Sequence, residues 1–266
     1  MTKTNYDIFI PARLDSSRLE QKHLSKINGK PAILHLIERL QNCKKIREII
    51  VCTTNNPSDN LLVKLLDERN IKYFRGNEKD ILQRFLDSAK KFETDVIIDV
   101  EGDKIYTDPF YVDEIVKNFS QNDNLDFIIG NDSEKKFNPT NHVVHGFIPA
   151  GIHVRALEKL CKIKKTNNTE TGYREFFLTP GMFKSQYLLL NKIKFPQHVR
   201  LTLDYKEDLE LAERIFGELG TNFNIHQVSK LFIQKPELLE ITKEIIQIWE
   251  ENYEKNRAKV HFNTNI

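Results

Sequence analysis

Short apolar runs alternate with amphipathic helical patterns through the first 130 residues of this 266-residue chain. The apolar runs predict strands at 7–10, 49–53, 72–74, 95–100 and 126–129. Between them, apolar residues recur at the spacing i, i+3, i+4 and i+7, which places side chains on one face of a helix. These residues are Ile33, Leu36, Ile37 and Leu40, and then Leu82, Phe85, Leu86 and Ala89. Strands that alternate with helices form βαβ units, so the pattern predicts an α/β fold around a mainly parallel sheet.

Residue types that are common at helix N-termini indicate where the predicted helices begin. Asn77 is the predicted N-cap of the second amphipathic helix, because its side chain accepts hydrogen bonds from exposed backbone N–H groups. Three prolines stand where a first helical turn tolerates them, namely Pro31, Pro57 and Pro109.

The second half of the chain is less regular. Residues 131–149 are polar and are interpreted as an active-site loop or an arm. The later elements are predicted as a strand at 151–154, a helix through residue 160, strands at 188–193 and 199–203, a helix at 206–217, and a helical C-terminal region that reaches residue 253. No repeat or low-complexity linker divides the chain, and its length suits one large α/β domain. We therefore expect a single domain over 1–266, with a C-terminal helical extension at 221–266.

The nearly balanced charge limits the choice of partners. The 40 Lys and Arg residues against 38 Asp and Glu give a formal net charge of +2, whereas nucleic-acid-binding domains carry a strongly basic face. We expect a small substrate and no nucleic acid.

Cysteine spacing and hydropathy indicate the compartment. Cys43, Cys52 and Cys161 are odd in number and far apart, which fits neither a disulfide framework nor a four-ligand zinc site. No apolar stretch approaches about 18 residues, and the N-terminus lacks a signal-type apolar segment. A cytoplasmic enzyme without a membrane span is the expectation.

A basic loop follows the first predicted strand. Arg13, Arg18 and Lys22 lie in ten positions, with the hydroxyls of Ser16 and Ser17 between them. Three cations and free backbone N–H groups suit a triphosphate, because each pairs with phosphate oxygens. Basic loop residues are more often solvated surface, but ligands of open α/β sheets bind beyond the carboxyl ends of strands. The loop is not a Walker loop, because the G-x-x-x-x-G-K-[ST] pattern is missing there.

Carboxylates follow two later predicted strands. Asp99, Glu101 and Asp103 alternate after a buried run, and buried carboxylates require partners or a metal. Asp204 follows the run at 199–203 and precedes a helix, so it and Asp103 occupy equivalent strand-to-helix positions and can converge. Paired carboxylates with phosphate oxygens and water suit Mg²⁺. The alternative for Asp204 is a helix N-cap.

Three ordered motifs resemble one known family. They are IPAR-x-x-SSRL-x-x-K-x-L followed by NGKPAILHLIERL at 28–40, VEGDKIYTDP at 100–109, and RLTLDYKEDLELAERIF at 200–216. Together they resemble the cytidylyltransferases that activate acidic sugars, such as CMP-Kdo and CMP-acylneuraminate synthetases. The segments RGNEKDILQRF at 75–85 and YREFFLTPGMF at 173–183 most resemble the spore-coat polysaccharide type.

The resemblance implies a fold, a reaction and a set of roles. The fold would be three-layer and Rossmann-like, of the nucleotide-diphospho-sugar transferase type, with a small arm at 131–190 for acceptor binding and dimerisation. CTP, Mg²⁺ and a small acidic sugar or polyol acceptor would be the ligands, and the enzyme would be a homodimer. The implied residues are Arg13, Lys22 and Asp103 for catalysis; Ala12, Arg13, Ser17, Arg18, Lys22, Arg84 and Glu101 for the nucleotide; Asp103 and Asp204 for the metal; and His145, Arg174 and Glu175 for the acceptor.

The chain departs from the family pattern at two places. It has Glu20-Gln21 where relatives usually have Pro-Gly, and Lys104-Ile105 after Asp103 where they have x-Pro. Lys104 either reads a carboxylate or phosphate of an unusual acceptor or is a pendant surface lysine.

Several other residues carry two interpretations. His142 and His145 form H-x-x-H, but no third zinc ligand has a convincing spacing and the segment is predicted to be non-helical, so loop histidines are favoured. Arg174 with Glu175 is either an acceptor-binding pair, since an Arg fork suits a carboxylate, or a surface pair. Trp249 is expected to serve in packing or in a subunit contact.

Two enzyme classes and one binding class remain for the function. The first is a CTP-dependent nucleotidyltransferase for surface glycan assembly, and the second is a GT-A-like glycosyltransferase with a D-x-D metal site within 99–103. The third is a relative that binds nucleotide without catalysis. The basic loop favours the first, because a triphosphate requires more positive charge than a diphosphate sugar.

Overall fold

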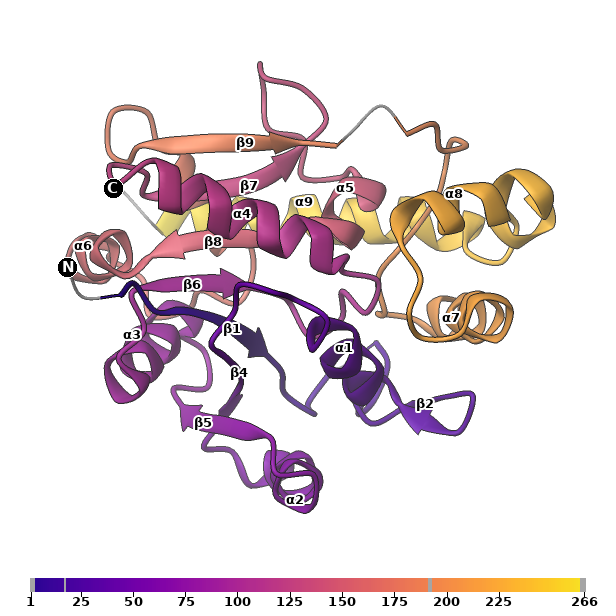
Figure 1. Ribbon diagram of the computed structural model, residues 1–266, viewed down its shortest axis with the longest axis horizontal. Coiled ribbons are helices and arrows are strands. Elements are labelled where there is room, and N and C mark those ends of the chain that lie inside the picture. The colour runs from indigo at the N-terminus through magenta and orange to yellow at the C-terminus, as the bar shows by residue number, and fades with distance from the viewer. Residues whose placement is uncertain (1–2, 17, 191–192, 264–266) are drawn as a thin grey trace.

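The computed structural model describes residues 3–16, 18–190 and 193–263, the last eight of these by backbone only. Its centre is a seven-stranded sheet in the order β5-β4-β1-β6-β8-β7-β9 (Figure 1). The strands are β1 (Tyr6–Pro11), β4 (Glu48–Thr54), β5 (Lys72–Gly76), β6 (Val96–Asp99), β7 (Phe127–Asn131), β8 (Ala150–His153) and β9 (Ser185–Leu189). β8 is antiparallel to both of its neighbours, and the other pairs are parallel. The predicted mostly parallel α/β fold is confirmed.

Helices cover both faces of the sheet. They are α1 (Ala32–Leu40), α2 (Asn60–Glu68), α3 (Ile81–Phe92), α4 (Pro109–Gln121), α5 (His142–Phe147), α6 (Val154–Ile163), α7 (Lys206–Leu219), α8 (Ile225–Gln234) and α9 (Lys243–Asn263). Short pieces complete the chain: a two-stranded ribbon of β2 (Lys26–Ile27) and β3 (Lys30–Pro31), and the 3₁₀ turns η1 (Pro57–Asp59), η2 (Tyr173–Leu178) and η3 (Pro236–Leu239).

The alternation of side chains along β1 divides the core into two layers. Ile8 and Ile10 belong to the cluster that includes α1 and α4, whereas Phe9 belongs to the cluster with α3 and α6. Successive side chains of a strand point to opposite faces, so a strand buried on both sides reads as a continuous apolar run. The two helical patterns seen in the sequence are buried as expected, from Ile33 to Leu40 in α1 and from Leu82 to Ala89 in α3.

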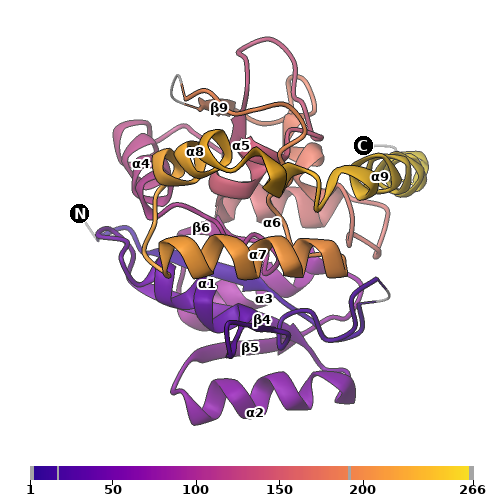
Figure 2. The ribbon, with the colours of Figure 1, turned by 90° about the vertical axis from the view of Figure 1, so that its right-hand side faces the viewer.

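The order of the strands brings the basic loop and the acidic segment to one edge. β1 pairs in parallel with β6, with Phe9 opposite Asp99, so residues after Pro11 and residues after Asp99 leave the sheet on the same side. Figure 2 looks onto this side of the molecule, where α7 lies across the view, α8 lies above it and α9 is at the upper right.

Four boundary predictions are wrong. Residues 199–203 form no strand, although they are buried, because they pass the sheet edge without a pairing partner. Residues 142–147 form a helix, α5, rather than irregular loop. Asp80, not Asn77, caps α3, because Asn77 accepts hydrogen bonds from the turn before the helix. The strand predicted at 188–193 is β9, which begins three residues earlier; residues 191–192 lie outside the described part.

The remaining later predictions agree with the structure. The helix expected at 206–217 is α7, and the strand and helix expected from 151 are β8 and α6. The C-terminal region is helical, as α8 and α9, and α9 extends ten residues past the expected end at Tyr253.

Replacing Phe85 with Ala should lower the free energy of unfolding by about 3–5 kcal/mol, because a large buried side chain leaves a cavity. Phe85 is fully buried, and its ring centroid lies 5.6 Å from that of Phe9 and 6.3 Å from that of Tyr173. Urea unfolding measures the change. Phe110→Ala is the matched control, because Phe110 is 52% exposed, and it should cost less than about 1 kcal/mol. Equal losses in both variants would contradict the assignment of Phe85 to the core.

Candidate active site

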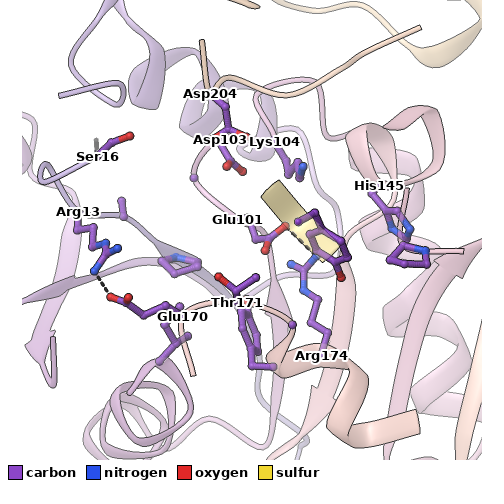
Figure 3. A pocket seen from close by; sticks show the side chains of 18 of the residues that line it. Arg13, Ser16, Glu101, Asp103, Lys104, His145, Glu170, Thr171, Arg174 and Asp204 are labelled. Carbon is purple, nitrogen blue, oxygen red and sulfur yellow. Dashed lines mark hydrogen bonds and ion pairs between the residues drawn. The ribbon is translucent and has the colours of Figure 1, made fainter. Parts of the chain in front are cut away.

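One pocket of about 580 Å³ lies beyond the carboxyl ends of β1 and β6 (Figure 3). All of the site residues that the sequence predicts within the described part of the chain line it. They are Ala12, Arg13, Arg18, Lys22, Arg84, Glu101, Asp103, His145, Arg174, Glu175 and Asp204. Ser17 lies outside the described residues. The sequence therefore locates the pocket, and the individual roles stay predictions.

A lysine joins the two aspartates at the centre of the site. Lys22 Nζ lies 2.9 Å from Asp103 Oδ2 and 2.8 Å from Asp204 Oδ1. Burial lowers the pKa of Lys22, but the two carboxylates outweigh this effect and raise it above its usual value. Burial conversely raises the pKa of Asp204, and Lys22 and Arg18 outweigh it, so that carboxyl stays ionised. Two segments 101 positions apart thus meet around one ammonium group.

The helix-cap alternative for Asp204 is wrong. The N-cap position of α7 belongs to Tyr205. Asp208, in the first turn, accepts hydrogen bonds from the backbone N–H groups of Asp204 and Tyr205, at 2.8 and 3.0 Å. Arg200 also donates to Asp208, through Nε at 2.7 Å. The Asp204 side chain is therefore left to face Lys22 and Arg18 Nη2, the latter at 2.9 Å.

Gly102 allows the turn after β6 and the loop after β1 to approach closely. A Cβ atom there would lie 2.7 Å from His23 Cε1 and 2.9 Å from the Pro11 carbonyl oxygen. The Gly102 N–H donates to that same oxygen at 3.2 Å. Glycine is thus required by contact between the turn after β6 and the loop after β1.

Arg13 lies across the pocket from the aspartates. Its guanidinium forms an ion pair with Glu170 and a second with Asp15, whose Oδ1 is 3.0 Å from Nε (Figure 3). The basic loop therefore divides: Arg18 and Lys22 face the aspartate pair, and Arg13 faces the loop before η2. No pattern in the sequence marked Glu170, because it stands in a polar turn of common composition.

Arg174 is held inside the protein by the acidic segment. Its Nε donates to Asp99 Oδ2 at 2.7 Å, its Nη1 to Glu101 Oε2 at 3.1 Å, and its Nη2 to the Asp99 carbonyl at 3.0 Å. Tyr173 donates its hydroxyl to the same Asp99 oxygen at 2.8 Å. The surface interpretation of Arg174 is wrong, because its guanidinium is buried and bound to the acidic segment. Arg174 also lines the pocket, and its contact with an acceptor stays a prediction.

Arg84 is likewise held by hydrogen bonds, in this case to the turn before its own helix. It is buried, and its guanidinium donates to the carbonyls of Asn77 and Glu78, the latter at 3.2 Å. Arg84 thus holds the turn before α3 and borders the pocket. Arg75, at the start of the segment at 75–85, donates to the Thr54 and Asn56 carbonyls and does not line the pocket.

The far end of the pocket carries polar groups with few partners. Lys104 Nζ donates to Thr202 Oγ1 at 3.1 Å, and no carboxylate of the described chain forms an ion pair with it. His142 Nε2 is buried without a hydrogen-bond partner, and His145 Nε2 donates to the Asn138 carbonyl at 2.8 Å. Burial and nearby cations lower the pKa of His142 to about 3 and that of His145 to about 4, so both are neutral at pH 7.

The aspartate pair suits a magnesium ion completed by a ligand. Asp103 Oδ1 is buried and has no hydrogen-bond partner, so it retains a lone pair for a cation. No group of three or more His, Cys, Asp or Glu side chains that could hold a metal occurs among the described residues. Two carboxylates with phosphate oxygens and water are a usual magnesium environment, whereas a closed zinc site requires four protein ligands. The donor set thus fits the hard-oxygen metal and not the H-x-x-H zinc alternative.

Comparison with known families decides the class. A family model described as cytidylyltransferase matches residues 8–245. The chain belongs to the cytidylyltransferase family. Membership makes it a nucleotidyltransferase of the group that serves sugar activation, and the resemblance read from the motifs is confirmed.

Two relatives of this cytidylyltransferase span most of its length, and a third spans less than half of it. An uncharacterized protein of Methanocaldococcus jannaschii is 30% identical over 240 residues, which cover 90% of this chain and 94% of that protein. The spore coat polysaccharide biosynthesis protein SpsF of Bacillus subtilis is 25% identical over 224 residues, covering 79% and 86%. A 3-deoxy-manno-octulosonate cytidylyltransferase of Geotalea daltonii is 31% identical over 116 residues, covering 44% and 45%.

Solved structures share the fold. A cytidylyltransferase of Leptospira borgpetersenii aligns with a TM-score of 0.76 at 23% identity, covering 89% of this chain and 97% of that one. A CMP-2-keto-3-deoxy-manno-octonic acid synthetase complexed with CTP aligns with a TM-score of 0.61 at 17% identity, covering 81% and 99%.

Hydropathy adds one observation about the helices. Within the described ranges, none of them combines the length and the apolar character needed to cross a membrane.

The free energy of unfolding should fall as the pH is lowered from about 6.5 toward 4 because of three buried histidines. The folded pKa of His142 is about 3, and those of His23 and His145 are about 4, each lowered mainly by burial. In this pH window the unfolded chain binds more protons than the folded one. Each histidine therefore lowers the free energy of unfolding by up to about 1.4 kcal/mol for each pH unit of acidification.

The test compares urea unfolding of the wild type and His145→Gln between pH 7 and 4.5. Burial raises the pKa of Glu101 and of Asp208, which acts in the opposite direction, so the difference between the two proteins is the informative quantity. The variant should show the smaller loss of stability on acidification. Parallel pH profiles would contradict a neutral buried His145.

Proposed function

We propose that this enzyme transfers a cytidylyl group from CTP to a small anionic sugar acid or polyol, with release of pyrophosphate, in surface glycan biosynthesis. The observation that carries the proposal is the meeting of Asp103 and Asp204 at Lys22, beside a basic loop at the end of β1. Family membership supports the reaction class, and the CTP named in the structure of the CMP-2-keto-3-deoxy-manno-octonic acid synthetase supports the nucleotide.

The proposed reaction is an in-line displacement at phosphorus. An acceptor hydroxyl oxygen forms a bond to the α-phosphorus of CTP and loses its proton to solvent, the bond from that phosphorus to the α,β-bridging oxygen breaks, and pyrophosphate leaves. Positioning and electrostatic stabilisation supply most of the catalysis in such transfers, so no nucleophilic triad is needed. Arg13, Arg18 and Lys22 are the groups proposed to balance the charge of the leaving pyrophosphate.

Asp103 and Asp204 are the residues proposed to hold Mg²⁺. The ion, when bound, would neutralise phosphate charge and polarise the phosphoryl group. Lys22 now compensates the two carboxylates, and the phosphates of CTP would give its ammonium group a second set of anionic partners. Asp103 and Asp204 already share the buried ammonium group of Lys22. We propose that Mg²⁺ takes the place of this ammonium group between them.

The glycosyltransferase alternative has less support. It requires the carboxylates at 99–103 to act together as a D-x-D metal site. Asp99 is fully buried, is bound by Arg174 and Tyr173, and does not line the pocket. The acidic segment therefore offers the pocket only Glu101 and Asp103.

Pyrophosphate release from each of the four nucleoside triphosphates, with Mg²⁺ and a panel of acidic sugars and phosphorylated polyols, tests the reaction and the base together. We expect release with CTP and an anionic acceptor. Release of free UDP from UDP-sugars without pyrophosphate would contradict the proposal. In the same assay Asp103→Asn should lower turnover by about two to three orders of magnitude, which is the usual effect of removing one preorganised electrostatic group.

The matched control for that variant is Asp123→Asn. Asp123 is exposed in the loop between α4 and β7 and does not line the pocket. It should retain wild-type turnover. An Asp103→Asn enzyme with near-normal activity would contradict the metal assignment, and a loss of turnover in both variants would point to a stability effect instead.

Lys104 is proposed to bind the anionic group of the acceptor. It lines the pocket, its ammonium group has only the Thr202 hydroxyl as a partner among the described residues, and the unpartnered His142 Nε2 faces the same end. A buried polar atom without a partner is one that a ligand hydroxyl would satisfy. Arg174, which the sequence also predicted for the acceptor, already binds Asp99 and Glu101, so Lys104 is the pocket cation with fewer anionic partners.

Lys104→Met should raise the KM for the acceptor about 10- to 100-fold, since a charged hydrogen bond contributes about 1.5–3 kcal/mol. Lys104→Arg, which keeps the charge, should lose much less. The KM for CTP should change little in either variant. Steady-state kinetics with the acceptor found in the panel assay provide the measurement, and an unchanged acceptor KM in Lys104→Met would assign Lys104 to the surface.

The homodimer, the cytoplasmic location and the division into an acceptor region at 131–190 and an extension from 221 stay predictions. Residues of both of these regions line the pocket, among them His145 and Trp249.

A further inference from the structure

The C-terminal helix lies at the end of the family match and yet forms part of the pocket. The cytidylyltransferase model ends at residue 245, whereas α9 runs from Lys243 to Asn263. Trp249, Asn252 and Tyr253 of this helix line the same pocket as Asp103 and Asp204. Figure 1 shows α9 passing behind the sheet, on the side away from α4. The sequence predicted only packing or a subunit contact for Trp249.

Trp249 contacts the side chain of Asp204 directly. Its indole Nε1 donates to Asp204 Oδ2 at 3.2 Å, and its side chain is 9% exposed. The ring meets that of His142 edge to face, with centroids 4.5 Å apart, and lies over the guanidinium of Arg200 at 5.4 Å. The indole is therefore fixed by its neighbours as well as by its hydrogen bond.

A second contact fixes α9 to the opposite wall of the pocket. Tyr253 lies one helical turn after Trp249, and their rings stack with centroids 5.0 Å apart. The Tyr253 hydroxyl donates to Glu175 Oε1 at 2.7 Å, next to the Arg174 that binds the acidic segment. One face of α9 thus connects the segment that carries Asp204 with the turn η2.

The two oxygens of Asp204 have different partners. Oδ1 accepts from Lys22 Nζ at 2.8 Å and from Arg18 Nη2 at 2.9 Å. Oδ2 accepts from Trp249 Nε1 at 3.2 Å, and from Arg200 Nη2 at the longer distance of 3.5 Å. Arg200 is bound chiefly to Asp208, through two bonds of 2.7 and 3.0 Å. Trp249 is thus the closer donor to the oxygen that does not contact Lys22 or Arg18.

We propose that Trp249 is a positioning residue: its indole N–H holds Asp204 Oδ2 so that Oδ1 is presented to the cation and phosphates of the bound nucleotide. α9 then completes the active site within one chain. The inference rests on the proposed function, in which Asp204 holds Mg²⁺ beside CTP. Partners that orient a metal ligand from behind usually contribute 10- to 100-fold to metal affinity.

The chain itself supplies a probe, because Trp249 is its single tryptophan. In the full-length wild type, intrinsic tryptophan emission is recorded while MgCl₂ is titrated into protein with CTP and no acceptor, so that no turnover occurs. We expect a saturable change in emission at the Mg²⁺ concentrations at which calorimetry detects tighter CTP binding. Emission that stays constant while calorimetry shows magnesium-dependent binding would overturn the inference.

Two variants of α9 separate positioning from packing. Trp249→Phe keeps a ring in the wall and removes the N–H donor, so the Mg²⁺ concentration for half-maximal CTP binding should rise about 10-fold. Ile248→Ala is the matched control, because Ile248 is the adjacent residue of the same helix and is 49% exposed, and it should shift that concentration less than about twofold. Calorimetry is run below the unfolding temperature of each variant.

The outcomes distinguish three accounts. A Trp249→Phe protein with a lower unfolding temperature but wild-type magnesium dependence would assign Trp249 to packing alone and overturn the inference. A wild type that binds CTP with Mg²⁺ and a variant that requires more Mg²⁺ support it. Failure of the wild type to bind CTP at any Mg²⁺ concentration would overturn the proposed function first, and the inference with it.

Discussion

The ion pair of Lys22 with Asp103 and Asp204 is the constraint on which the site depends. An unpaired buried charge is strongly unfavourable, and so each of these three groups requires the others to remain buried and ionised. The loop after β1, the turn after β6 and the segment before α7 must therefore bring these three side chains into contact. Gly102 makes this approach sterically possible, and the parallel pairing of β1 with β6 brings two of the three segments to the same edge.

The elements that the sequence predicted well are those whose pattern is local. Strand β1 and helices α1 and α3 have complete apolar patterns, and the residues of these patterns are buried in the core on the two faces of the sheet. The run at 199–203 has the same apolar character but no neighbouring strand, and pairing is a tertiary property that a run of residues does not encode. The α3 boundary was displaced because Asn77 and Asp80 are both good caps, and the choice between them depends on the turn before the helix.

The sequence predicted which residues line the site, but not which of them contact one another. Cations after the first strand and carboxylates after later strands were recognisable from their position, and they line one pocket. The partners were not: Arg13 with Glu170, Arg174 with Asp99, and Trp249 with Asp204 join positions far apart in the chain. No spacing rule connects such residues, so their contacts required coordinates. Trp249 carried one usable signal, in that it is the single tryptophan of the chain and lies in the C-terminal helix.

The central claim is that Asp103 and Asp204 exchange Lys22 for a metal ion when a nucleotide binds. A crystal structure of the protein grown with CTP and Mn²⁺, with anomalous data collected at the manganese edge, tests this directly, because manganese occupies magnesium sites and can be located without ambiguity. The account predicts an anomalous peak within coordination distance of both carboxylates, with the triphosphate on the loop that carries Arg18 and Lys22. A nucleotide bound elsewhere, with no manganese peak and with Lys22 still joining the two aspartates, would contradict it.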